Sequence, residues 1–271
     1  MIKARYLGAA GLEFIFQGKT ILVDPFISRY TMEELQAGPL VPQADAVNSY
    51  LDELQGEIAA VLMGHTHYDH ALDMPIIANQ LKGPLVGSQS LETLMAAHDL
   101  PGLVTVCKGG ETVDLMPGAT VTMLLSKHGI IGDRVPSPGE IEPDLKPPLL
   151  VTDYKLGTIC IAKLQLGDLT FMVCGSANFI PEEVEGHTCD VLFMGAGGWQ
   201  KTREYVQQLP AMVKPKVIIP YHTDNFFIPI PEDRKTPLMP GLELEKFTEI
   251  VSKSAPDAEI RILDTFQYTE F

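Results

Sequence analysis

The stretch His65-Thr66-His67-Tyr68-Asp69-His70 holds three of the seven histidines of the chain and one aspartate. It follows an apolar run at residues 58–63 and a single glycine, Gly64. The run is short, partly β-branched and closed by glycine, which is typical of a buried strand that ends in a tight turn. The alternative is a polar loop whose histidines cap strand and helix ends, but capping does not call for so many histidines together. The sequence therefore predicts a metal site at the carboxyl end of a strand.

The spacing within this stretch divides its side chains into two pairs. Just past a strand end, side chains two residues apart still tend to point the same way, so His65 and His67 can share one metal ion. Asp69 and His70 follow after the chain has begun to turn, and they face a second position close by. Neutral imidazole nitrogen and carboxylate oxygen are ligands of zinc, iron and manganese. The set suits one or two zinc ions best and leaves iron and manganese as alternatives.

Two later strands also end in histidine. The apolar residues 119–125 precede Lys127 and His128, and the apolar residues 217–221 precede His222. A lone histidine at a strand end usually has a structural role, so neither indicates a metal ligand by itself. Asp24 stands at the end of an early strand beside a proline, where it either initiates a turn or accepts a hydrogen bond from a ligand imidazole.

The His-x-His-x-Asp-His pattern of residues 65–70 resembles the signature of the metallo-β-lactamase superfamily. The resemblance implies a four-layer αββα sandwich of mixed α/β class, which agrees with early strand meanders and later alternation of strands and helices. It also implies two sets of ligands, His65, His67 and His128 for a first ion and Asp69, His70 and His222 for a second. The nearest likeness is to the branch with ascorbate-phosphate lactonases and N-acyl-phosphatidylethanolamine phospholipase D. That likeness comes from Leu-x-x-Ala-Gly at 7–11, Val-Asp-Pro-Phe at 23–26 and His-Tyr-Asp-His at 67–70.

The chain departs from this family at Gly175-Ser176. In the family that the chain resembles, most members with two metal ions have Gly-Asp-Thr at this place, and the aspartate bridges the two ions. One branch of the family also has serine here and completes its second site with an aspartate and two histidines, which the chain offers as well. The other alternative is a second ion that binds weakly or not at all. We expect Ser176, like Asp24, to contact the ligands without binding an ion itself.

The resemblance implies a metal-dependent hydrolase that uses a zinc-bound hydroxide on a small ester, lactone or phosphoester. In this prediction Asp69 and His222 are catalytic as well as metal-binding, and Asp69 orients the hydroxide. Tyr68, Tyr221 and Lys127 are adjacent to ligands and are candidates for substrate binding, while core packing and a solvated lysine are the plainer interpretations. Two alternatives are an iron-dependent oxidoreductase of the same fold, which would need an aspartate at position 176, and a metal-binding sensor or scaffold without turnover.

The composition restricts the partners. A chain of 271 residues with 45% hydrophobic residues can form one large domain or two small ones, and we predict a single domain over residues 1–271. A net charge of −15 without any basic run argues against nucleic acid, because phosphate binding needs clustered Lys and Arg. The sequence shows no signal peptide and no membrane span, and its four scattered cysteines suit a reduced cytoplasm. We predict a cytoplasmic protein with a small-molecule substrate and leave a homo-oligomer open.

Two loops are expected near the site. The proline-rich segment 130–154 directly follows His128, and a segment of that length usually forms a binding loop. We therefore expect it to shape the substrate pocket. The polar, proline-bearing segment 27–43 is expected to form a second, surface loop that reaches the mouth of the site.

Overall fold

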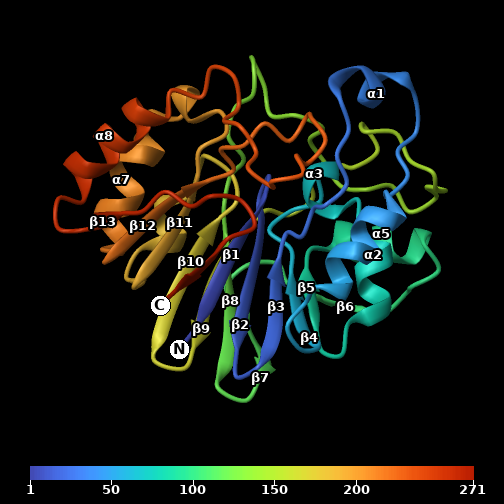
Figure 1. Ribbon diagram of the computed structural model, residues 1–271, viewed down its shortest axis with the longest axis horizontal. Coiled ribbons are helices and arrows are strands. Elements are labelled where there is room, and N and C mark those ends of the chain that lie inside the picture. Colours follow the sequence, from blue (N-terminus) through green and yellow to red (C-terminus); the bar gives the residue numbers. More distant parts are fainter.

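The structure is a computed structural model that describes residues 1–271. Two seven-stranded mixed sheets pack face to face, and helices cover their outer faces (Figure 1). This arrangement confirms the αββα sandwich predicted from the sequence. None of the helices is both long and apolar enough to cross a membrane.

The first sheet comes from the N-terminal part of the chain and one C-terminal strand. Its order is β14-β1-β2-β3-β4-β5-β6. The strands are β1 (Lys3–Gly8), β2 (Gly11–Phe16), β3 (Lys19–Val23), β4 (Ile58–Leu62), β5 (Leu85–Gly87), β6 (Val104–Val106) and β14 (Tyr268–Glu270). Strands β1 to β3 form an antiparallel meander, β3 to β6 are parallel, and β14 returns to pair with β1.

The second sheet has the order β13-β12-β11-β10-β9-β8-β7. Its strands are β7 (Thr112–Met116), β8 (Ala119–Leu125), β9 (Cys160–Leu166), β10 (Leu169–Cys174), β11 (Val191–Gly195), β12 (Val217–Tyr221) and β13 (Glu259–Ile260). Strands β8 and β10 are both antiparallel to β9, and β10 to β12 are parallel. The carboxyl ends of β8, β10 and β12 therefore lie at one edge of the sheet.

The helices form the two outer layers (Figure 1). They are α1 (Met32–Ala37), α2 (Ala44–Asp52), α3 (Tyr68–Ala71), α4 (Met74–Ile77), η1 (Ala78–Gln80), α5 (Gln89–Ala97), α6 (Pro181–Val184), η2 (Trp199–Lys201), α7 (Arg203–Val213) and α8 (Leu244–Ser254). Buried residues of α2 and α5 pack on the first sheet, and those of α7 and α8 pack on the second. Each sheet is thus buried on both faces, which explains why its central strands are apolar throughout.

An aromatic core joins the two sheets. Phe14 of β2 is fully buried, and its ring centroid lies 5.1 Å from that of Phe171 and 5.7 Å from that of Phe193, both in the second sheet. Burying one such side chain contributes about 1.5–3 kcal/mol. The contact holds the sheets in a fixed relation, so that loops from both sheets meet at the same edge of the sandwich.

Candidate metal centre

Two of the histidines predicted from the sequence meet directly after β4. His65 and His67 are buried, and His65 Nε2 lies 3.1 Å from His67 Nδ1. The turn before them needs Gly64, because a Cβ there would lie 2.9 Å from Asp24 Oδ2. The backbone N–H of Gly64 donates to Asp24 Oδ1 at 2.7 Å, which fixes the start of the turn.

The third imidazole arrives from the second sheet. His128 follows β8, and its ring centroid lies 5.0 Å from that of His65 and 4.7 Å from that of His67. Its Nδ1 contacts the carbonyl oxygen of Gly129 at 2.7 Å, which leaves Nε2 for the other two rings. One ligand atom from each of the three histidines lies within 4.8 Å of the others. We call these three residues the first cluster.

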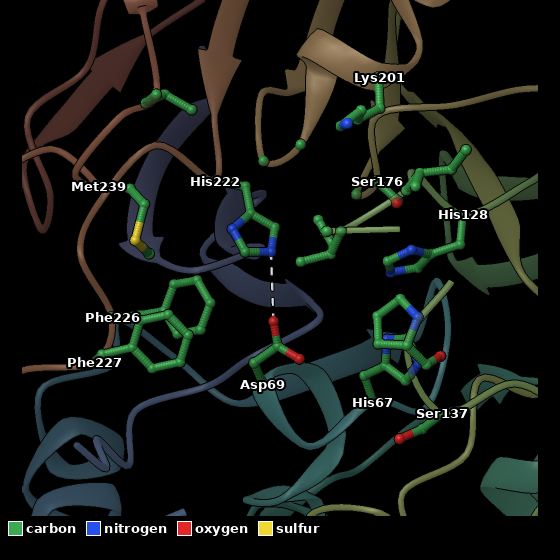
Figure 2. Close-up of a pocket in the computed structure, with 18 of the residues that line it drawn as sticks. His67, Asp69, His128, Ser137, Ser176, Lys201, His222, Phe226, Phe227 and Met239 are labelled. Carbon is green, nitrogen blue, oxygen red and sulfur yellow. Dashed lines mark hydrogen bonds and ion pairs between the residues drawn. The ribbon is translucent and has the colours of Figure 1, made fainter. Parts of the chain in front are cut away.

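Asp69, His70 and His222 form a second cluster, whose ligand atoms also lie within 4.8 Å of one another. His222 Nε2 lies 3.5 Å from Asp69 Oδ2, as the dashed line in Figure 2 marks. His70 Nε2 lies 3.9 Å from the same oxygen. The rings of His65 and His70 have centroids only 3.7 Å apart, so the two clusters are neighbours.

The charge states of these groups suit metal binding. Burial is the largest cause that lowers the pKa of His67 and of His128 to about 4, and it lowers the pKa of His65 as well. Burial opposes ionisation of Asp69, but His70 and His222 lower the pKa of its carboxyl group below its usual value. Neutral imidazoles and an ionised carboxylate are the forms that bind zinc or iron. The donor set therefore fits a metal ion at each cluster.

Asp24 stands behind the second cluster. It is buried, and its Oδ2 lies 3.2 Å from His70 Nδ1, the ring nitrogen that faces away from Asp69. Burial opposes protonation of His70, but Asp24 and then Asp69 raise its pKa. The geometry is the one expected of a carboxylate that sets the orientation of a ligand imidazole.

Ser176 follows β10 at the edge of the second sheet where His128 also lies. Its Oγ accepts a hydrogen bond of 2.9 Å from the backbone N–H of Gly129, next to His128. At the preceding Gly175 a Cβ would lie 3.2 Å from Asp24 Oδ2, which is closer than most Cβ contacts. Neither residue brings a carboxylate to the site, and Asp69 is the only carboxylate in either cluster.

His222 has an uncommon backbone conformation that the sequence did not reveal. Its φ is +56°, in the left-handed region that non-glycine residues rarely adopt. The hydroxyl of Tyr6 accepts a hydrogen bond of 3.0 Å from Thr223 N, and it donates one of 2.5 Å to Asp224 Oδ1. Asp224 also accepts one of 2.7 Å from Ala9 N. A buried network from β1 and the turn after it thus holds the residues that follow His222, and no local motif signals it.

A family model described as the Beta-lactamase superfamily domain matches residues 3–222, which include both clusters. The chain belongs to the metallo-β-lactamase superfamily. A curated relative from Paracoccus denitrificans (strain Pd 1222), named UPF0173 metal-dependent hydrolase, is 32% identical over 127 residues. That match covers 47% of this chain and 49% of the relative, so the chain matches about half of the relative's length.

Solved structures of other proteins share the architecture at low identity. Igni18, described as a novel metallo hydrolase from Ignicoccus hospitalis KIN4/I, has a TM-score of 0.63 and 17% identity over 100% of this chain and 99% of its own. CmlA, a diiron beta-hydroxylase from Streptomyces venezuelae, has a TM-score of 0.61 and 13% identity over 100% of this chain and 54% of its own. At these identities the likeness shows the fold alone.

In this metallo-β-lactamase fold, four of the six cluster residues line a cavity of about 590 Å³. Tyr68 lines it too, as expected, and so does much of the loop predicted to shape a pocket, including Ile130, Pro136 and Val151. The sequence did not single out other lining residues: Gln200, Lys201, Phe226, Phe227, Met239 and Leu242. No sequence pattern predicts these residues at the site, because they reach the cavity only through the folding of the loops that follow β11 and β12.

Two candidates for substrate binding do not reach this cavity. Lys127 is exposed and does not line it. Tyr221 is fully buried between the sheets, where its ring packs edge-on against Tyr6 and Phe193 at centroid distances of 6.1 and 5.9 Å. The prediction that Lys127 and Tyr221 contact substrate is therefore corrected: neither residue lines the cavity. Adjacent residues at a strand end point to different sides, so a neighbour of a metal ligand can point away from the site.

Proposed function

We propose that the protein is a metal-dependent hydrolase that binds zinc and cleaves a small ester, lactone or phosphoester. The observation that carries the proposal is the meeting of six metal-ligand side chains in two adjacent clusters, beside a cavity that four of them line. Membership of the superfamily and the likeness to a relative named metal-dependent hydrolase support the reaction class. The compatible donor chemistry supports the metal.

The first cluster, His65, His67 and His128, would hold one ion, and the second, Asp69, His70 and His222, would hold another. When bound, such an ion acts as a Lewis acid and lowers the pKa of a coordinated water molecule from about 15.7 to about 7. Ser176 supplies no carboxylate between the clusters, so we expect the second ion to bind more weakly than the first.

The residues of the chain would divide the remaining work. Asp69 is the only carboxylate that lines the cavity, so it is the group that accepts a proton from water and orients it toward the substrate. His222 Nε2 lies close enough to fix this carboxylate. Asp24 holds the far nitrogen of His70. Tyr68 lines the cavity and is the retained candidate for a hydrogen bond to substrate.

The chain would carry out this reaction as a single cytoplasmic domain. The cluster of 27 buried residues between the sheets includes residues from both halves of the chain, which favours one domain over residues 1–271. All four cysteines are free and buried, which suits a reducing compartment.

Metal content and turnover of the same preparations test the function. Wild type and Ser176→Asp, purified without added metal, are analysed by inductively coupled plasma mass spectrometry and assayed on esters, lactones and phosphoesters. We expect zinc in wild type, a higher zinc content in Ser176→Asp because a carboxylate joins the two clusters, and hydrolysis that a chelator abolishes. Bound iron with dioxygen consumption would instead favour an oxidoreductase. Metal binding without any turnover would favour a sensor or scaffold.

A further inference from the structure

The cavity beside the clusters has an apolar wall on one side. Phe226, Phe227, Met239 and Leu242 form it, and we call them the apolar wall. The rings of Phe226 and Phe227 lie 4.4 Å apart, and Phe226 packs against His222 with ring centroids 5.2 Å apart. Figure 2 shows Phe226, Phe227 and Met239 together on one side of His222. A wall of this kind binds aliphatic or aromatic groups of a ligand through burial of apolar surface.

Lys201 lies on another side of the site. In Figure 2 it lies across His222 from Phe226, Phe227 and Met239, on the same side as Ser176 and His128. No other lysine or arginine lines the cavity. Lys201 takes part in none of the ion pairs of the chain, so no neighbouring carboxylate neutralises its charge. In a protein with a net charge of −15, an unpaired cation at the cavity is a local attraction for an anionic ligand.

The backbone on both sides of Lys201 is held in place. Trp199 is fully buried and donates from Nε1 to Leu242 O at 2.8 Å, and Gln200 Nε2 donates to Gly241 O at 2.9 Å. On the other side, the hydroxyl of Thr202 donates to Ala177 O. The lysine therefore extends from a fixed turn rather than from a mobile loop, which limits the volume that its ammonium group can sample.

We propose that the substrate is an amphiphilic carboxylic ester that carries an apolar group on one side of the ester bond and an anionic group on the other. The apolar group lies against the apolar wall, the ester lies at the clusters, and the anion pairs with Lys201. This inference names a substrate class for the proposed hydrolase and rests on that function. A phosphoester is a poorer match, because the cavity has no second cationic side chain for a phosphoryl group.

The reaction is a hydrolysis without oxidation or reduction. The oxygen of water forms a bond to the acyl carbon, and the bond from that carbon to the ester oxygen breaks. One proton of water passes to the departing oxygen. The products are a carboxylic acid, which ionises at neutral pH, and an alcohol or phenol.

Binding of an analogue that cannot be hydrolysed tests the inference separately from catalysis. The probe is 4-(hexyloxy)benzoate, and its neutral counterpart is 4-(hexyloxy)benzamide, each titrated into the metal-loaded protein by calorimetry. We expect the benzoate to bind about tenfold more tightly than the benzamide, which corresponds to about 1.4 kcal/mol. Lys201→Ala should remove this difference, and Lys201→Arg should keep it. Lys108→Ala is the matched control, since Lys108 is exposed and lies outside the cavity.

The hydrolysable esters test the orientation and the apolar wall. We expect 4-(hexanoyloxy)benzoate to exceed 4-acetoxybenzoate at least about tenfold in kcat/KM, because added methylenes contact an apolar pocket. Phe227→Ala should reduce that ratio, because kcat/KM should fall more for the hexanoyl ester than for the acetyl ester, while the zinc content stays the same. Circular dichroism spectra of every variant should match wild type.

The outcomes separate this inference from the proposed function. Equal binding of benzoate and benzamide, or equal loss of both in Lys201→Ala, would overturn the role of Lys201 even if esters are hydrolysed. Equal kcat/KM for acetyl and hexanoyl esters would overturn the role of the apolar wall. Binding of the benzoate that depends on Lys201, without hydrolysis of any ester, would support the site and overturn the hydrolase.

Discussion

The two sheets supply the site in opposite ways. The first sheet delivers four candidate ligands from one strand end, since His65, His67, Asp69 and His70 all follow β4. The second sheet delivers one residue from each of three strand ends, and its contributions lie about fifty residues apart: His128 after β8, Ser176 after β10 and His222 after β12. The first contribution is local in sequence, and the second exists only in the folded sandwich.

This difference extends to how the residues are held. The residues after β4 share one turn, which Asp24 fixes through Gly64 and His70. The residues of the second sheet each have a separate support. His128 contacts its neighbouring carbonyl, and the chain after His222 depends on the hydroxyl of Tyr6. A dispersed site of this kind should tolerate the loss of one support at one ligand without losing the others.

The largest effect is expected when one of the four ligands that follow β4 is removed. His67→Ala removes one of three imidazoles from the first cluster and leaves two neutral rings in a buried site. We expect metal content to fall and hydrolysis of the preferred ester to drop by at least about 10³-fold, the scale of losing a principal electrostatic element. His187→Ala is the control, because His187 belongs to neither cluster. Unchanged metal content and rate in His67→Ala would contradict the assignment of the first cluster.

A smaller effect is expected behind the second cluster. Asp24 has a φ of +43°, a conformation that asparagine tolerates, so Asp24→Asn removes the charge beside His70 and keeps the backbone. We expect the affinity for the second ion to fall by about 10–100-fold, with the first ion retained. Competition with a chromophoric chelator measures both affinities. Equal weakening of the two ions would show that Asp24 acts on the whole turn rather than on His70.

A still smaller effect is expected from removal of the Tyr6 hydroxyl, which supports the chain after His222. Tyr6→Phe removes the only hydrogen-bond acceptor of Thr223 N in this network and one of the two donors to Asp224 Oδ1, and we expect a loss of about 1–3 kcal/mol in the free energy of unfolding. The second ion should also bind more weakly, because His222 loses support for its left-handed backbone. Tyr221→Phe is a matched control for stability, since the buried hydroxyl of Tyr221 makes no hydrogen bond. Urea unfolding of both variants measures the difference.

The contrast between the sheets explains what the sequence could predict. The signature of residues 65–70 is local, so it could be read directly, and its resemblance to the metallo-β-lactamase superfamily implied the sandwich. The pairing of β14 with β1 joins residues at opposite ends of the chain, and no local pattern reports it. The same holds for the bond from Tyr6 to Asp224 and for Lys201, which stands at the cavity where Lys127 was expected.

The smallest expected effect is a difference between the two sheets in the rate at which their cysteine thiols react. Three cysteines belong to the second sheet or precede its strands, and burial raises the pKa of Cys160, Cys174 and Cys189 to about 12. At pH 8 these thiols are almost entirely protonated, and only the thiolate reacts with iodoacetamide. Cys107 is also buried, but it follows β6, the edge strand of the first sheet, where opening of the structure is easiest.

We therefore expect no labelling of the native protein at pH 8 over minutes, slow labelling of Cys107 first, and labelling of all four thiols in urea, as measured by intact-mass spectrometry. The sign of the pH effect follows from the raised pKa values. Between pH 8 and 10 the thiolate fraction of a buried cysteine rises about tenfold per unit, so labelling should accelerate with pH rather than level off near the usual pKa of about 8.5. Early labelling of Cys174 in the native protein would mean that the second sheet opens more readily than the first, because its pKa leaves too little thiolate for direct reaction. The dispersed contributions to the site would then rest on the less stable half of the sandwich.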